Sequence, residues 1–240
     1  MFKPDKVVAV GGDGTVSFVA ECLLQNNIPL GVLPAGSANG LAKELGISEI
    51  PAEALHVILA GAVKKIHVLK LNDRLCIHLS DIGFNACMVK KFQSEKIRGI
   101  WGYVKATIKV ARSLLFINSI MQVSIVMDNE IIEIKAAMNV IANGTKYGTG
   151  AVINPSGSIE DELFEVIVIK KIAASEILKM LVSHASFDHD KTVVFKTSHL
   201  TMRLKKKAYF QVDGEYIGKV ADIEAILLTA AIELIVPVSN

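Results

Sequence analysis

Apolar residues in the first 46 positions follow two successive patterns of strand, loop and helix. The run Val7 to Val10 leads into a glycine-rich corner, Gly11 to Thr15, and a stripe of apolar residues with helical spacing follows: Val16, Val19, Ala20, Leu23 and Leu24. The second pattern has an apolar run at 28–34, a loop at 35–40 and a short helical segment at 41–46. Two such units predict a parallel sheet with both loops at the carboxyl ends of its strands, the edge where open α/β sheets bind ligands.

A third helix is predicted between Pro51 and Gly61, and the pattern then changes to short apolar or alternating runs. These runs predict strands at 64–71, 75–83, 120–127, 134–142, 164–170, 192–197, 200–205 and 208–212. Helical segments interrupt them at 97–116 and 175–184. The sequence therefore predicts an α/β domain over 1–61 and a β-sandwich-like domain over 62–228, with a cleft between them and with residues from about 229 to 240 as candidates for returning to the first domain.

Composition narrows the class of protein. The chain has 240 residues, 51% of them hydrophobic, and a net charge of +2 with acidic and basic residues interspersed, so no strong electrostatic field indicates a nucleic-acid partner. No run approaches the roughly 20 apolar residues of a membrane span, although a mean hydropathy of +0.43 leaves room for a surface that contacts lipid. The three cysteines form no pair with metal-ligand spacing, so we expect buried free thiols and a cytoplasmic protein.

Both glycine-rich corners have the composition of a phosphate site. Glycines let backbone N–H groups approach a ligand, and the helix that follows adds partial positive charge. Asp13 beside phosphates indicates a bound cation, hence Mg²⁺ and a nucleotide, and Thr15 offers a hydroxyl. The second loop adds Gly36 for close approach, hydroxyl and amide groups, and a charge: Ser37, Asn39 and Lys43. The simpler interpretation is a glycine-rich turn with an aspartate cap.

The segments GGDGT (11–15) and PAGSANGLA (34–42) resemble the diacylglycerol kinase/sphingosine kinase family of ATP-dependent lipid kinases. The likeness continues through DIGFNA (81–86), SEKIRGIWGY (94–103) and the stretch from 141 to 171, and it ends with QVDGEYIG (211–218). It implies a nucleotide domain joined to a β-sandwich, and transfer of the terminal phosphate of ATP to a lipid hydroxyl at the membrane surface.

The resemblance also implies roles for individual residues. Those implied to hold the nucleotide are Gly11, Gly12, Asp13, Gly14, Thr15, Gly36, Ser37, Asn39 and Glu215. Asp13 would contact Mg²⁺, and Asp161 would be the general base that takes the hydroxyl proton. Asn85 and Lys43 would line the substrate cleft. Without the resemblance, 160–162 is typical of a solvated acidic turn and 213–215 of a hairpin turn.

The chain departs from the family pattern at several positions. Ser17-Phe18 stands where the family has Asn-Glu, and Gly40, Asn85 and Glu162 replace Asp, Asp and Gly. Such changes indicate either a different lipid or weak activity. About ten residues precede the first corner, too few for the βαβ unit of roughly 30 that the family places there. We therefore expect either a truncated chain or a second subunit, as in a homodimer, over an exposed strand edge.

Two other functions fit the same sequence. NAD kinases share a GGDG corner, so a phosphotransferase of that kind is the first alternative. The second is a nucleotide- or lipid-binding protein without catalytic activity, because the front segment is missing.

Overall fold

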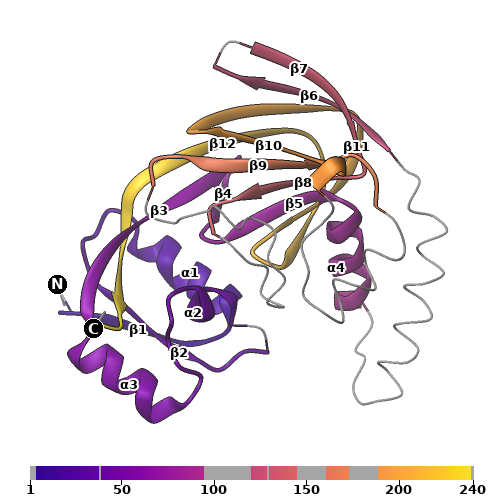
Figure 1. The fold of residues 1–240 in the computed structure, drawn as a ribbon. Helices are drawn as coiled ribbons and strands as arrows, with labels where there is room; N and C mark the ends of the chain where they lie inside the picture. The colour runs from indigo at the N-terminus through magenta and orange to yellow at the C-terminus, as the bar shows by residue number, and fades with distance from the viewer. Residues whose placement is uncertain are drawn as a thin grey trace.

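The computed structural model describes residues 4–37, 39–94, 120–128, 130–144, 161–172 and 189–238. Their helices and strands are, in order, β1 Val7–Gly11, α1 Asp13–Leu23, β2 Leu30–Pro34, α2 Gly40–Glu44, α3 Pro51–Ala60, β3 Ala62–Leu71, β4 Arg74–Cys76, β5 Leu79–Gly83, α4 Phe84–Ser94, β6 Met121–Met127, β7 Glu130–Ala136, β8 Met138–Ala142, β9 Phe164–Ile169, the 3-10 helix His189–Lys191, β10 Thr192–Thr197, β11 His199–Val212 and β12 Glu215–Val236. The strands join in one hydrogen-bonded sheet, which is shown in Figure 1.

The N-terminal part is a small α/β layer built on β1 and β2. These strands pair in parallel from Val7↔Leu30 onwards, as the sequence predicts. Helix α1 covers one face, where its residue Ala20 is fully buried, and α3 covers the other face of β2, where Ile58 packs against Gly31. β2 is buried on both faces, which explains why its sequence is almost continuously apolar.

The C-terminal part is a β-sandwich-like structure of antiparallel strands. The path β11-β5-β8-β9-β10 forms one run, and the β6–β7 hairpin pairs with β11. Strand β6 has the predicted alternation, with Val123 and Ile125 fully buried and Gln122 exposed. Inward-facing residues of β5, β6, β8, β9, β11 and β12 form one large hydrophobic core. The predicted class, α/β followed by a β-sandwich-like domain, is therefore confirmed.

Strand β12 runs through both parts of the molecule (yellow in Figure 1). It pairs with β11 over its first half and with β3 over much of its length, and near its end Leu234 pairs in parallel with Leu30 of β2. Its register against β3 shifts between Leu228 and Ile232, and Ala230 has a φ of +48°. The odd-numbered Ile223 faces the C-terminal core and the even-numbered Leu234 faces the N-terminal core, so the two cores lie on opposite faces of this strand.

Several sequence predictions need correction. The segment 75–83 forms two strands, 134–142 spans the end of β7 and all of β8, and 200–205 and 208–212 belong to one strand, β11. Cys22 is exposed rather than buried, whereas Cys76 is buried as predicted. The predicted helices at 97–116 and 175–184 lie outside the described residues.

Strand β1 is an edge strand. Among the described residues it pairs with β2 alone, and its Val8 and Val10 are 42% and 58% exposed. An apolar edge strand of this kind can pair with another strand. The helices of the described part include none with the length and apolar character needed to cross a membrane.

Candidate active site

The first glycine-rich corner ends β1 and begins α1. Gly12 is the N-cap residue of α1, and no side chain caps the helix there. The first helical hydrogen bonds run from Thr15 N and Val16 N to Gly12 O, at 3.0 and 3.1 Å. The N–H groups of Asp13 and Gly14, which precede these donors, therefore have no acceptor within the helix and favour an anion at this end.

The second corner is closed by Asn39, which lies in the left-handed conformation at the start of α2. Its Oδ1 accepts a hydrogen bond from Gly36 N at 2.9 Å, and its Nδ2 donates to Gly36 O at 3.0 Å. The same Nδ2 donates to Glu49 Oε1 at 3.0 Å. Asn39 thus shapes the loop, and its role in nucleotide binding stays a prediction, as does that of the exposed Ser37.

Asp13 connects the two corners. Its Oδ2 accepts a hydrogen bond from Gly40 N at 2.9 Å and its Oδ1 accepts one from Leu41 N at 3.0 Å, so the carboxylate caps α2 from a distance of 27 residues along the chain. Each oxygen keeps a second lone pair. The predicted contact of Asp13 with Mg²⁺ therefore adds to this structural role and stays a prediction.

The corners are in backbone contact. A Cβ atom on Gly12 would lie 3.1 Å from Gly36 Cα, and one on Gly36 would overlap with Gly12 Cα. Only glycine fits at this crossing. The two loops therefore form one continuous rim at the carboxyl ends of β1 and β2.

A third segment reaches this rim from the other end of the chain. Asp213 and Gly214 form a two-residue hairpin turn between β11 and β12, and both have positive φ (+46° and +83°), as a type I′ turn requires. Asp213 accepts backbone hydrogen bonds from Ile77, His78 and Leu79 at 2.9 to 3.2 Å. It also accepts one from Ser17 Oγ of α1 at 2.7 Å.

Asp213 therefore fixes the turn against both parts of the protein. The sequence indicated the turn but not this role, because its partners lie about 135 residues away. Ser17 takes part at a position where the family pattern has Asn.

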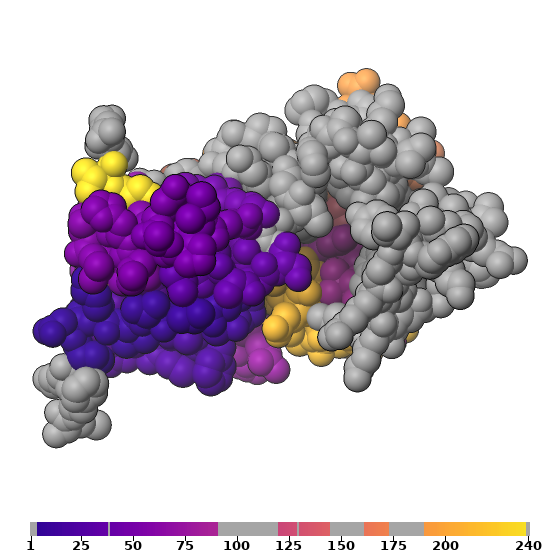
Figure 2. Space-filling view, turned by 90° about the horizontal axis from the view of Figure 1, so that it is seen from below, coloured from indigo at the N-terminus to yellow at the C-terminus, as the bar shows by residue number. Residues whose placement is uncertain are grey.

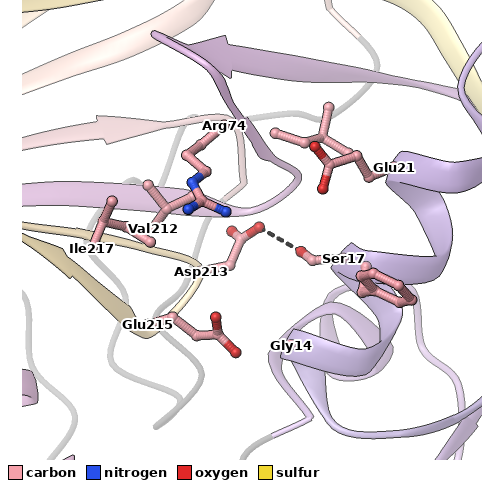
Figure 3. A pocket seen from close by; sticks show the side chains of 10 residues that line it. Gly14, Ser17, Glu21, Arg74, Val212, Asp213, Glu215 and Ile217 are labelled. Carbon is pink, nitrogen blue, oxygen red and sulfur yellow. Dashed lines mark hydrogen bonds between the residues drawn. The ribbon is translucent and has the colours of Figure 1, made fainter.

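Glu215 lies directly against the first corner. A Cβ atom on Gly14 would overlap with Glu215 Oε1, so the carboxylate lies in close contact with the first turn of α1. Between α1 and the hairpin is a cavity of about 120 Å³, lined by Gly14, Ser17, Phe18, Glu21, Arg74, Leu75, Val212, Asp213, Glu215 and Ile217. Figure 3 shows Arg74 and the carboxylates of Glu21, Asp213 and Glu215 around this space. In Figure 2 the gold β11–β12 segment reaches the surface beside the indigo N-terminal residues.

The remaining predicted residues lie elsewhere. Lys43 pairs with Glu49 at 3.4 Å. The hydrogen bond from Asn39, and then the Lys43 ammonium, lower the pKa of the Glu49 carboxyl below 4.5. Asn85 lies at the start of α4, where its Nδ2 donates to Asp81 Oδ2 at 2.6 Å. Neither Lys43 nor Asn85 lines the cavity.

Asp161 also lies outside the lining of this cavity. It precedes β9, and its Oδ1 is buried without a hydrogen-bond partner among the described residues. Lys196 of β10 pairs with the fully buried Glu165 at 2.8 Å. Glu165, and to a smaller extent Asp161, raise the pKa of Lys196. The role of Asp161 as general base stays a prediction.

Comparison with known families covers almost the whole chain. Residues 2–71 match the family described as the diacylglycerol kinase catalytic domain, and residues 83–236 match the YegS C-terminal NAD kinase beta sandwich-like domain. A probable lipid kinase YegS of Escherichia coli (strain SMS-3-5 / SECEC) is 30% identical over 218 residues, which cover 87% of this chain and 71% of that protein. The chain belongs to the YegS/diacylglycerol kinase family of lipid kinases.

The chain spans about half the length of some of the relatives that it matches. An uncharacterized protein of Synechocystis is 29% identical over 98% of the chain, which spans only 55% of that protein's length. Solved structures agree in fold. A putative diacylglycerol kinase from Bacillus anthracis has a TM-score of 0.74 at 20% identity, covering 97% of this chain and 77% of that one. An NAD kinase from Archaeoglobus fulgidus in complex with ATP has a lower TM-score, 0.55, at 15% identity over 96% of this chain and 77% of that one.

Proposed function

We propose that this member of the YegS/diacylglycerol kinase family is an ATP-dependent lipid kinase that transfers the γ-phosphate to a lipid hydroxyl at the membrane surface. The observation that carries the proposal is the convergence of three segments on one rim. Gly12 and Gly36 touch through their backbones, and Glu215 stands over Gly14. Phosphoryl transfer depends mainly on positioning and charge neutralisation, and this rim offers both N–H groups and carboxylates for that task.

The donor set fits Mg²⁺ held jointly with a nucleotide. Carboxylate oxygens, the ligands that Mg²⁺ prefers, come from Glu21 and Glu215 in the cavity lining and from Asp13 at the first corner. Asp213 uses both of its oxygens for hydrogen bonds to Ser17 and to residues 77–79. The described residues contain no group of three or more His, Cys, Asp or Glu placed to hold a metal ion alone. We therefore infer a metal shared between the phosphates and one or two carboxylates, with Glu215 and Asp13 as its candidates. When bound, Mg²⁺ would neutralise charge on the phosphates.

The chain's own residues supply binding and proton transfer. N–H groups at the start of α1 would bind the phosphates, and Arg74, which faces the cavity, would add positive charge. Asp161 would accept the proton of the lipid hydroxyl. Since Asp161 does not line the cavity beside Glu215, the acceptor would approach from the side of β9 and β10.

The test is transfer of radiolabelled γ-phosphate from ATP into a total lipid extract, with NAD as a separate acceptor. A labelled lipid supports the proposal, and labelled NADP without labelled lipid supports the NAD kinase alternative. ATP binding with no transfer to either acceptor supports a non-catalytic protein.

Three variants test which residues take part in phosphate transfer. We expect Asp161→Asn to abolish transfer without unfolding the protein, and Glu215→Gln to raise the KM for ATP about tenfold or more. Asp128→Asn makes the same chemical change in the exposed β6–β7 turn and should leave activity unchanged. If Asp161→Asn retains normal lipid phosphorylation, the assignment of the base is wrong.

A further inference from the structure

A buried carboxylate outside the cavity connects the Asp213-Gly214-Glu215 turn to helix α4. Asp81 of β5 is fully buried and accepts hydrogen bonds through both of its side-chain oxygens. Its Oδ1 accepts from Ala86 N at 2.7 Å, and its Oδ2 accepts from Asn85 Nδ2 at 2.6 Å and from Gln211 Nε2 at 2.5 Å. Two of these donors belong to the first turn of α4 and one belongs to β11.

Gln211 connects Asp81 to the turn through hydrogen bonds from both ends of its amide. It lies directly opposite Asp81 in the antiparallel pairing of β5 with β11, and it is only 1% exposed. While its Nε2 donates to Asp81, its Oε1 accepts a hydrogen bond from Gly214 N at 2.7 Å. Gly214 immediately precedes Glu215, whose carboxylate stands over Gly14.

The direction of each hydrogen bond is fixed. A backbone N–H can only donate, so Gly214 requires the oxygen of the Gln211 amide, which turns the NH₂ group towards β5. There it requires an acceptor, and Asp81 accepts from all three of the donors named above. An amide at position 81 would turn its NH₂ group either to Ala86 N or to the amides of Asn85 and Gln211. With glutamine at 211, a carboxylate is therefore the side chain that satisfies all three donors.

We propose that Asp81 is a positioning residue: through Gln211 it holds the peptide before Glu215 in place, and it orients the first turn of α4 with the same carboxylate. Glu215 belongs to the nucleotide side of the site and Asn85 is the residue expected in the substrate cleft, so Asp81 joins the two sides. This inference rests on the proposed function for its kinetic meaning. Its structural content, the dependence of Glu215 on Asp81, can be measured by ATP binding alone.

The test removes the acceptor at position 81 and then exchanges the carboxylate of position 81 with the amide of position 211. In Asp81→Ala the NH₂ group of Gln211 loses its acceptor, because alanine offers none, and we expect the Kd for ATP and the KM for ATP to rise about tenfold, as for loss of a buried hydrogen bond to a charged group. Gln211→Glu alone places two carboxylates together and should weaken ATP binding as well. The double variant D81N/Q211E restores the order. The carboxylate introduced at position 211 can accept from both Gly214 N and the NH₂ group introduced at position 81, the new amide oxygen can accept from Ala86 N, and the Asn85 amide turns to present its oxygen. This double variant should bind ATP nearly as well as the wild type.

Thr197→Val is the matched control. Thr197 is 2% exposed and forms two hydrogen bonds with the backbone of His199. His199 begins β11, whereas the Asp213-Gly214 turn follows the other end of that strand. We expect this variant to lower the melting temperature and to leave the KM for ATP unchanged. A merely structural role for Asp81 would give the same result in Asp81→Ala, namely fewer active molecules with unchanged affinity for ATP.

The outcomes separate the two proposals. An unchanged Kd for ATP in Asp81→Ala, or no recovery of the Gln211→Glu affinity in D81N/Q211E, overturns the positioning role even if the wild type phosphorylates lipid. If the affinities follow the exchange but no lipid is labelled, the positioning role stands and the lipid kinase function fails. If the wild type does not bind ATP, both proposals are wrong.

Discussion

Replacement of Asp213 by asparagine tests how firmly the β11–β12 turn is anchored. The carboxylate accepts hydrogen bonds from three consecutive backbone N–H groups, those of Ile77, His78 and Leu79, and from Ser17 Oγ. Asparagine keeps one oxygen, and its NH₂ group is best placed towards Ser17 and Ile77, because the serine hydroxyl can turn to accept. One N–H group, that of Ile77, then lacks an acceptor.

The expected cost follows from these contacts. A buried N–H group without an acceptor costs about 1–3 kcal/mol, and the remaining bonds lose the contribution of a full charge. Because Asp213 is only partly buried, we expect the free energy of unfolding to fall by about 2–3 kcal/mol. For a chain of this size, each kcal/mol corresponds to about 2–4 °C, so the melting temperature should fall by about 5–10 °C.

Thermal and urea unfolding, followed by circular dichroism, measure this loss. Ser17→Ala is the control, since it removes a single donor and should cost about 1 kcal/mol or less. A change in unfolding free energy below about 0.5 kcal/mol for Asp213→Asn is the size expected for an ordinary surface substitution. That result would refute the conclusion that Asp213 anchors the turn.

Three further predictions concern other residues. Gly14→Ala should leave stability nearly unchanged, because alanine favours the helix, while its methyl group displaces Glu215 and raises the Kd for ATP in an equilibrium titration. Because the pKa of Glu49 is lower in the folded protein, its ionised form stabilises the fold above pH 4.5, and this stabilisation is lost as the pH falls through the folded-state pKa. The free energies of unfolding of the wild type and of Glu49→Gln should therefore differ at about pH 6 and converge in acid. Burial and Asp213 raise the pKa of Cys76 well above 9.0, so an alkylating reagent should label the exposed Cys22 in the native protein and Cys76 only after unfolding, as mass spectrometry would show.

Local pattern was enough to predict most of the fold. The helical stripe of α1, the proline and glycine at the ends of α3 and the alternation in β6 each depend on neighbours within a few residues. Strand β12 could not be predicted in the same way. Its odd-numbered Ile223 and Leu227 face the C-terminal core, whereas its even-numbered Leu228 and Leu234 face the N-terminal core. The strand passes from one core to the other, which lies on its opposite face, and a local alternating pattern does not show where this happens.

The site shows the same division between local and distant information. The two glycine-rich corners and the hairpin turn could be identified from the sequence because each is a short motif. The partners of their carboxylates could not, because Asp13 binds the start of α2 and Asp213 binds residues about 135 positions away. Arg74 carries no motif, and only the folded chain brings it to the cavity.

The continuous path of β12 limits how the two parts of the protein can move. β3 and β12 remain paired on both sides of the bulge, from Ala225↔Leu71 to Val236↔Ala62. A hinge that opened the molecule would have to bend two hydrogen-bonded strands at once. We expect any change in the angle between the glycine-rich corners and the large core to bend this ribbon near the bulge, where the pairing of β3 with β12 is interrupted.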